Sequence, residues 1–312
     1  MGELNTKYLS GETSIFIKTG SEFEKLPVKN LLKKSLSDVY LWNGYKWVKI
    51  NGFKQIPVQG MRKEISFSDG NKIYCLSTQK LVSSTGEIKS IDELQIGDTV
   101  KKIAAFPNNT TNINISDKQL VSIAYWITRG NNSKKECSFA LQNVNNEQRV
   151  VVDFIKGFSC ENVSLNTIDG VPYIQFISGD FIDFVLTYVC GKSIKTKTLT
   201  NAFWNLNNNQ LKTFLSALIN CVDHKKIDTK TETFVFPADN SNFINDLRIL
   251  TLRLGYTLNT EVKDGVVNCT LIYEPSTSVE ISNISAFGSL YFYDVSVDSK
   301  DGLFALANGI VV

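Results

Sequence analysis

Short segments in which apolar and polar residues alternate dominate the first third of the chain. They are rich in β-branched and aromatic residues, and turn sequences such as Asn43-Gly44, Asn51-Gly52 and Asp69-Gly70 separate them. Alternation with a period of two residues predicts half-buried β-strands, and Asp-Gly between two such segments predicts a tight hairpin. We expect strands at residues 14–18, 39–41, 47–50, 64–67, 72–76 and 99–103, followed by a loop at 106–115.

The pattern changes to helical spacing in the middle of the chain. Apolar residues recur every three or four positions in residues 116–128, directly after Ser116, a residue type that caps helices. The order helix, strand, helix, hairpin then occurs twice, with Asp169-Gly170 and Asp264-Gly265 at the two hairpin turns. Two αββ-type halves predict a domain with pseudo-two-fold symmetry. The expected helices are 116–128, 146–158, 179–189, 209–222 and 240–254, and the expected strands are 138–142, 163–166, 172–177, 233–237, 257–262 and 266–273.

The last segment returns to short apolar strands, which we expect at residues 290–297, 303–307 and 310–312. An all-β start, an α/β middle and an all-β end predict one β domain that is interrupted by a second domain. We therefore expect an all-β domain formed by residues 1–110 and 276–312. The inserted α/β domain would span residues 111–275, with repeats at about 116–195 and 205–275.

Composition narrows the class of protein. The chain has 312 residues, 43% hydrophobic and 21% charged, which is typical of globular domains and not of disordered chains. It contains no apolar run long enough to cross a bilayer and no signal peptide at its start. The six cysteines show no metal-ligand spacing, and predict a reducing compartment: the cytoplasm, or the interior of a virus particle. The 33 basic and 31 acidic residues do not indicate a polyanionic partner.

Four motifs lie in order at the two ends of the chain. They are Leu-Ser-Gly-Glu-Thr at residues 9–13, residues 72–81 together with 91–98, Phe-Tyr-Asp-Val-Ser-Val at 292–297, and the segment 304–312. Together they resemble the sequence blocks of an intein-type Hint domain. The resemblance implies a horseshoe-like β fold that carries out protein splicing.

The middle of the chain resembles a two-repeat LAGLIDADG homing endonuclease. Residues 121–130 and 215–223 are similar to the two dodecapeptide helices, residues 197–199 and 203–204 to the approach to the second one, and residues 243–256 to the family's helix with a Leu-Gly ending. The resemblance implies a saddle-shaped sheet that binds DNA. It also implies that the dodecapeptide helices pack through the small residues Ser122, Ala124, Ser216 and Ala217.

Splicing requires a nucleophilic Cys or Ser, an activating His, and a terminal Asn, usually after His. The resemblance places Tyr8 at the nucleophile position, Gln79 at the His position and Leu76 at the position of an accompanying Thr, and the chain stops at Val312, where His-Asn would follow. The only histidine of the chain, His224, lies in the inserted segment. Ser10 is the alternative nucleophile, although a polar residue in a strand-entry turn is its simpler interpretation. We expect splicing to be absent.

Cleavage of DNA in this family requires one acid at the C-terminal end of each dodecapeptide helix, where the pair binds Mg²⁺. The resemblance places Arg129 and Val222 at these positions. A shift by one residue would bring Asp223 to the second position, beside His224, but the first helix has no acid near Arg129. We therefore expect no catalytic residue, no metal site and no cofactor. Mg²⁺ would be needed only if the nuclease is active after all.

Binding of DNA without cleavage remains an alternative, although residues 116–275 contain as many acidic as basic residues. The strands that the resemblance places in the DNA groove carry few charges. Of the aromatic pairs Tyr125-Trp126 and Phe203-Trp204, which resemble base-stacking groups, the first is expected in the core. Ordinary solvated surface is the simpler interpretation of the candidate DNA contacts, which are Lys134, Lys135, Lys192, Lys195, Lys197, Lys225, Lys226 and Lys230.

These observations lead to one hypothesis with two alternatives. The first is a catalytically inactive, domesticated intein-like and endonuclease-like protein that serves as a structural or protein-interaction module in a larger assembly, such as a viral or phage particle. One alternative is a non-cleaving double-stranded DNA-binding protein. The other is an active LAGLIDADG endonuclease, whose Mg²⁺-dependent cleavage Asp223→Asn would abolish. A membrane or a small-molecule substrate is not expected.

Overall fold

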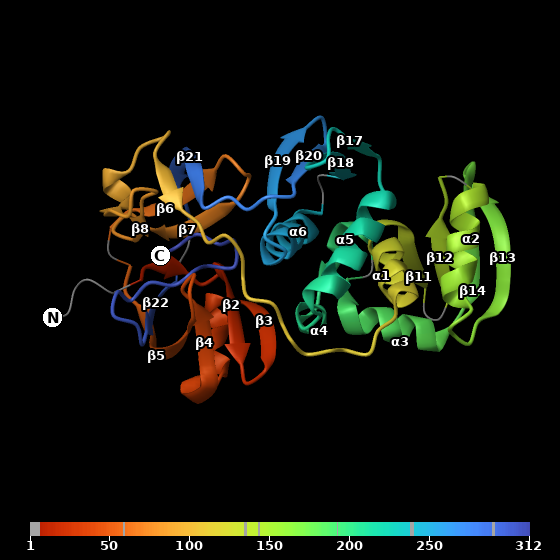
Figure 1. The fold of residues 1–312 in the computed structure, drawn as a ribbon, viewed down its shortest axis with the longest axis horizontal. Coiled ribbons are helices and arrows are strands. Elements are labelled where there is room, and N and C mark those ends of the chain that lie inside the picture. Colours follow the sequence, from red (N-terminus) through yellow and green to blue (C-terminus); the bar gives the residue numbers. More distant parts are fainter. Residues whose placement is uncertain are drawn as a thin grey trace. The chain divides into compact units, whose positions relative to one another are not determined.

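A computed structural model describes residues 7–58, 60–133, 136–142, 144–191, 193–237, 240–288 and 291–312. It divides the chain into two compact units. Unit 1 comprises Met1–Asn108, Arg248–Glu261 and Thr270–Val312, and unit 2 comprises Asn109–Leu247 and Val262–Cys269. The red-to-orange start and the dark blue end of the chain therefore belong to the same unit (Figure 1).

Unit 1 is built on a ten-stranded sheet of order β10-β21-β6-β7-β1-β22-β5-β4-β2-β3. The central strand β1 pairs antiparallel with β7 on one side and with β22, from the end of the chain, on the other. The strands are β1 (Leu9–Ser10), β2 (Ser14–Thr19), β3 (Glu22–Pro27), β4 (Val39–Trp42), β5 (Trp47–Ile56), β6 (Arg62–Phe67), β7 (Lys72–Leu76), β10 (Thr99–Lys101), β21 (Ser278–Ala286) and β22 (Phe292–Val297). A separate hairpin, β8 (Lys80–Val82) and β9 (Ile88–Ser90), and three 3₁₀ helices, η1 (Val28–Lys33), η2 (Leu36–Asp38) and η3 (Ile91–Glu93), complete this part.

The core of unit 1 follows from alternation along these strands. Ile15 and Ile17 of β2, Ile65 of β6 and Val295 of β22 are fully buried, and neighbouring positions on several strands are more exposed. The predicted Asp69-Gly70 hairpin is confirmed, since β6 and β7 pair on either side of it and Gly70 has a φ of +83°. A turn of this kind favours Gly, which has no Cβ to clash in the left-handed region.

Between Asp117 and Ile272 the chain contains the same order of elements twice. The first repeat consists of α1 (Asp117–Arg129), β11 (Gly130–Ser133), β12 (Glu136–Ala140), α2 (Val144–Ile155), β13 (Glu161–Ile168), β14 (Val171–Ile177) and α3 (Gly179–Tyr188). A connection of β15 (Val189–Cys190), η4 (Ile194–Thr196), β16 (Thr198–Leu199) and α4 (Asn201–Trp204) follows. The second repeat consists of α5 (Asn208–Asn220), β17 (His224–Lys226), β18 (Thr231–Pro237), α6 (Ser241–Arg253), β19 (Thr257–Lys263) and β20 (Val266–Ile272).

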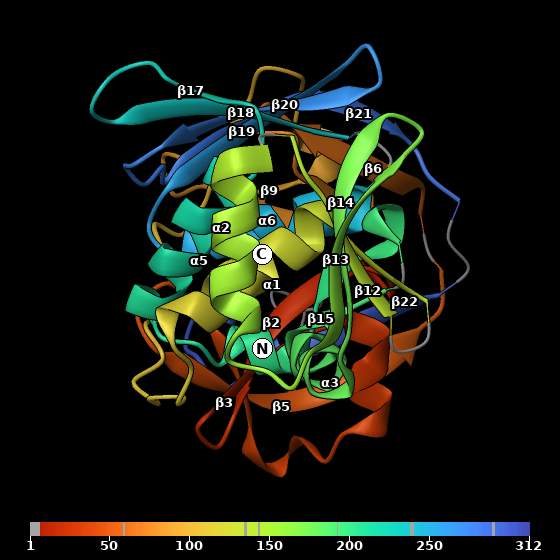
Figure 2. The same ribbon diagram turned by 90° about the vertical axis from the view of Figure 1, so that its right-hand side faces the viewer.

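Each repeat forms a four-stranded sheet, with the strand order β11-β12-β14-β13 in the first and β17-β18-β20-β19 in the second. In both sheets the last strand in sequence lies between the second and the third. The β13–β14 and β17–β18 hairpins are visible as paired ribbons in Figure 2. Ser116 and Asn207 start α1 and α5 with the same arrangement, in which the cap side chain accepts a hydrogen bond from the backbone of a Gln three residues later. The predicted cap at Ser116 is thus confirmed.

Several elements differ from the sequence-based expectation. Strands β11 (Gly-Asn-Asn-Ser) and β17 (His-Lys-Lys) were not predicted, because they lie at sheet edges and carry no apolar alternation. The predicted strands at 303–307 and 310–312 are wrong. These residues form only isolated bridges, because a tight turn with Gly309 at a φ of +87° reverses the chain between them. The predicted packing role of Ser216 is also wrong, since its side chain is exposed.

The expected insert spans residues 111–275. Within it, the backbone contacts group residues 248–261 and 270–275 with unit 1. Arg253 at the end of α6, for example, lies over the rings of Phe16 and Phe23. Among the described helices, none is long and apolar enough to cross a bilayer.

Candidate functional sites

The structure brings together the two residues that the Hint resemblance places at the centre of acyl transfer. Gln79 is fully buried, and its Oε1 accepts a hydrogen bond of 2.6 Å from the backbone nitrogen of Tyr8. Its Nε2 donates to the carbonyl oxygen of Lys80, also at 2.6 Å. An amide side chain does not titrate, so Gln79 holds the Tyr8 amide in place but cannot transfer a proton to or from it.

Apolar side chains surround this pair. Ile56, Leu76 and Phe292 form a buried cluster, and the half-buried Tyr8 and Val58 pack against it. Ser10, the alternative nucleophile, is buried in β1 opposite Phe292, and its Oγ accepts a hydrogen bond of 3.4 Å from the backbone nitrogen of Glu12. This contact is typical of a turn-stabilising serine.

Lys7 and Asp294 flank the same position and were not identified from the sequence. Asp294 Oδ1 accepts a hydrogen bond of 2.8 Å from the backbone nitrogen of Lys7. The Lys7 ammonium nitrogen lies 5.9 Å from the centroid of the Phe304 ring, and burial lowers the pKa of Lys7 to about 8. Because Asp294 bonds to the backbone, its carboxylate fixes the path of the chain into β1.

The second candidate site lies where α1 and α5 end. These two helices pack against each other more extensively than any other pair of described helices. Arg129, the last residue of α1, is buried and points across the interface. Its Nε donates to the carbonyl oxygen of Cys221 at 3.0 Å, and its Nη2 donates to Gln142 Oε1 at 2.7 Å.

A buried ion pair completes the Arg129 network. Arg129 Nη1 pairs with Glu147 Oε1, and the other oxygen of this carboxylate accepts a hydrogen bond of 2.7 Å from the backbone nitrogen of Gln142. The oxygens around the guanidinium are therefore a carboxylate, a side-chain amide and a main-chain carbonyl, which are the ligand types that Mg²⁺ prefers. Arg129 occupies these oxygens itself, so the residues at the end of α1 do not fit a metal ion.

The end of α5 offers no acid to replace those missing from α1. Val222 is half-buried, and Asp223 is exposed with its backbone oxygen bonded to the Val235 nitrogen at 3.2 Å. His224 is exposed on β17, and its Nδ1 lies 3.2 Å from the Val222 oxygen. Within the described part of the chain, His, Cys, Asp and Glu side chains form no group of three or more that could hold a metal ion.

Lys197 was predicted as a DNA contact, and this prediction is wrong. The side chain is fully buried, and its Nζ donates to the carbonyl oxygens of Trp126 and Gly130 at the C-terminal end of α1. The Nζ also lies 4.7 Å from the centroid of the Trp126 ring. Burial lowers the pKa of Lys197 to about 7. The terminal carbonyls of a helix attract a positive group, which explains why the lysine points inward.

The other candidate lysines fall into two groups. Lys195, Lys225, Lys226 and Lys230 are exposed, and the last three lie on or beside the β17–β18 hairpin, where Lys226 is opposite Glu232. Lys134, Lys135 and Lys192 lie outside the described residues. Tyr125 and Trp126 are buried, which confirms their prediction as core, and Phe203 and Trp204 are buried as well.

No protein-family model and no curated protein matches the sequence. Among solved structures, the endonuclease I-DmoI in complex with DNA and Mn is similar with 12% identity and a TM-score of 0.35, over 51% of this chain and 90% of that chain. An Ssp DnaB mini-intein variant has 14% identity and a TM-score of 0.28, over 36% and 71%. Full-length WhiA from Thermatoga maritima has 8% identity and a TM-score of 0.31, over 52% and 53%. Similarities at this level assign no family, so a functional assignment has to rest on the residues of this chain.

Arg129→Met tests the structural role of the ion pair. The substitution leaves the Glu147 carboxylate buried without its partner, which costs roughly 3–5 kcal/mol in comparable cases. We expect urea unfolding to show a loss of this size, and Arg129→Met/Glu147→Met to recover most of it. Arg149→Met, at an exposed arginine on α2, is the matched control and should change the free energy of unfolding by less than about 0.5 kcal/mol. A similar small effect of Arg129→Met would contradict this role.

Lys197 predicts a dependence of stability on pH. Its pKa in the folded chain is about 7, below its ordinary value of 10.5, so between these pH values the unfolded chain binds a proton that the folded chain does not. The free energy of unfolding should therefore rise with pH in this window, by at most about 1.4 kcal/mol per pH unit from this group. Urea unfolding of Lys197→Met should show a shallower rise. Lys7 contributes in both proteins, so equal slopes would show that Lys197 is not buried as described.

Proposed function

We propose that this chain is a catalytically inactive, intein-like and endonuclease-like protein that serves as a structural or protein-interaction module in a larger assembly, such as a viral or phage particle. The Arg129 network carries the proposal. In a nuclease of the type that unit 2 resembles, the helix ends hold acids that bring Mg²⁺ to the scissile phosphate. Here a fixed cation takes that place, and the nearby Glu147 carboxylate is bound to it.

Loss of the nuclease follows from the charge at this position. A divalent cation would have to displace the Arg129 guanidinium from Glu147 and then share the site with it. Both steps are unfavourable, because breaking a buried ion pair costs several kcal/mol and like charges repel strongly where water is excluded. Asp223 remains as an exposed carboxylate without a second acid beside it on α1.

Loss of splicing follows from the chemistry of Tyr8 and Gln79. Acyl transfer needs a strong nucleophile and a group that donates a proton to the departing amine. A phenol is a poor acyl acceptor, and the amide of Gln79 cannot act as an acid. Leu76 adds an apolar wall instead of a hydroxyl group. The hydrogen bond between Gln79 and the Tyr8 amide supports the assignment of these two residues to the former acyl-transfer position.

Restoring the two residues tests this proposal. We expect no thiol-dependent cleavage of the Lys7–Tyr8 bond in the native chain or in either single variant, Tyr8→Cys or Gln79→His. The double variant places a thiol and an imidazole together, so thiol-dependent cleavage should become detectable by mass spectrometry. Cleavage of the native chain would contradict the inactive assignment. An inert double variant that is still folded would contradict the position assigned to Tyr8 and Gln79.

A non-cleaving DNA-binding protein is the second candidate, and one observation favours it. Asn131, Ser138, Gln175 and Ser164 lie in register across all strands of the first sheet, β11, β12, β14 and β13. Amide and hydroxyl groups on a sheet can pair with the edges of bases. None of these side chains is charged, however, and contacts to phosphates supply most of the affinity of proteins for DNA.

Fluorescence anisotropy with duplex DNA distinguishes the two candidates. The proposed function predicts no binding tighter than about 10⁻⁶ M between roughly 50 and 200 mM salt, with or without Mg²⁺. Tighter binding that weakens steeply with salt would put the DNA-binding protein first. In that case Lys225→Ala/Lys226→Ala/Lys230→Ala should flatten the salt dependence. Cleavage of the duplex that Asp223→Asn abolishes would support the active endonuclease instead.

A further inference from the structure

The segment Arg248–Glu261, which we call the arm, runs from the middle of α6 into β19 and belongs to unit 1. It contains the C-terminal half of α6 and most of β19. From the sequence, all of it was expected in the inserted α/β domain, residues 111–275. Its side chains reach elements that are far apart in the ten-stranded sheet. These contacts suggest a role that neither the Hint nor the endonuclease resemblance implies.

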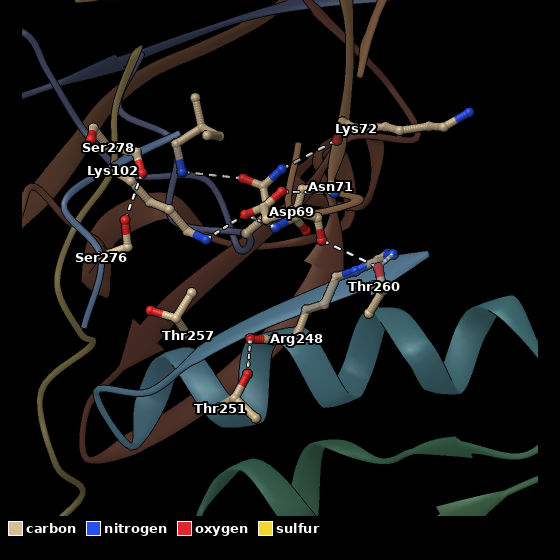
Figure 3. Close-up of polar contacts among 12 residues, drawn as sticks. Asp69, Asn71, Lys72, Lys102, Arg248, Thr251, Thr257, Thr260, Ser276 and Ser278 are labelled. Atoms are coloured by element: carbon tan, nitrogen blue, oxygen red, sulfur yellow. Dashed lines mark hydrogen bonds and ion pairs between the residues drawn. The ribbon is translucent and has the colours of Figure 1, made fainter. Parts of the chain in front are cut away.

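The two ends of the arm meet at the β6–β7 turn (Figure 3). Thr260 Oγ1 of β19 donates a hydrogen bond of 3.2 Å to the backbone oxygen of Asp69, and Arg248 Nη2 of α6 donates to the same Thr260 hydroxyl. Lys102, which follows β10, pairs with Asp69 Oδ2 at 2.6 Å, and only 8% and 5% of the two side chains are exposed.

The β6–β7 turn is held in place by hydrogen bonds and an ion pair to the Asp69 carboxylate. Asn71 donates to Asp69 Oδ1 from its backbone nitrogen at 2.9 Å and to Oδ2 from its side chain at 2.8 Å. With Lys102, the Asp69 carboxylate therefore has three donors. A buried carboxylate with so many partners resists a change of conformation, since each lost bond exposes an unpaired charge.

Two glycines permit close approach of the arm. A Cβ on Gly70 would collide with the Thr260 hydroxyl and lie 2.7 Å from Arg248 Nη2. A Cβ on Gly309 would lie 2.7 Å from Leu252 Cδ2 in the arm. Both glycines have positive φ, so their conformations also favour the absence of a side chain.

The middle of the arm contacts the last two strands of the sheet, β2 and β3. Arg253 is 1% exposed, and its guanidinium carbon lies 5.7 Å from the centroid of Phe16 in β2 and 5.3 Å from that of Phe23 in β3. The two rings contact each other edge to face at 5.6 Å. Burying a guanidinium is costly, and interaction with aromatic faces offsets part of the cost.

We propose that the arm is a strap across unit 1 that the ten-stranded sheet needs to stay folded. The sheet begins with β10 and ends with β2 and β3. The arm reaches Lys102, next to β10, through Asp69, and it reaches β2 and β3 through Arg253. Detaching the strap therefore removes contacts from the β6–β7 turn, to which Lys102 beside β10 is bound, and from β2 and β3. The arm is thus a structural part of unit 1, whether or not unit 2 binds a partner.

Hydrogen exchange on the full-length chain tests the strap, with Gly70→Ala as the probe and Gly86→Ala as its matched control. Both glycines have positive φ, +83° and +93°, but a Cβ on Gly86 meets nothing within 4 Å. Relative to the control, Gly70→Ala should speed exchange by about tenfold or more in the arm and in both sheet edges, β10 and β2–β3. Exchange in α1 of unit 2 should stay unchanged.

Thr260→Val provides a second, milder probe, because it removes the hydroxyl but does not alter the β6–β7 turn. It should raise the exchange rates of the same segments in the same proportion, although by less. Faster exchange in the arm with unchanged exchange in β2–β3 would overturn the proposal, since the sheet would then hold without its strap. Equal effects of Gly70→Ala and Gly86→Ala on the whole of unit 1 would also overturn it.

Discussion

Unit 2 depends on how the C-terminal ends of α1 and α5 are neutralised. The last carbonyl groups of a helix have no partner within it and carry partial negative charge, so two such ends at one interface require a positive group. Arg129 supplies it to the Cys221 carbonyl of α5, and the Lys197 side chain donates hydrogen bonds to the Trp126 and Gly130 carbonyls of α1. The carbonyl groups at both helix ends are therefore satisfied by side chains of this chain.

According to our proposal, the two units lack catalytic residues for different physical reasons. In unit 2 a fixed cation takes the place of acids and metal. In unit 1 an amide that cannot titrate and an apolar cluster around Tyr8 take the place of a proton donor and a nucleophile. Both sets of replacements make contacts that stabilise the fold.

Local signals allowed much of the fold to be predicted from sequence. The cap at Ser116, the Asp69-Gly70 hairpin and the buried Trp126 each depend on a pattern within a few residues, and each is confirmed. The burial of Lys197 and Arg253 could not be predicted, because charged residues are exposed by default and their partners, Trp126 and Phe16, are remote in sequence. The contacts of the arm with unit 1 also join residues remote in sequence, so the sequence pattern gave no sign of them. The pairing of Tyr8 with Gln79 was expected only through the family resemblance.

Residue-resolved NMR with Mn²⁺ tests most directly whether the helix ends of unit 2 still recruit a metal. A bound paramagnetic ion broadens the signals of nearby amides, so a titration of the full-length chain reports the place of binding and not only its strength. We expect amides at residues 126–131 and 219–223 to broaden no more than those of the exposed β17–β18 hairpin. Selective, saturable broadening at both helix ends would contradict the inactive assignment of unit 2, because Mn²⁺ would then bind despite Arg129.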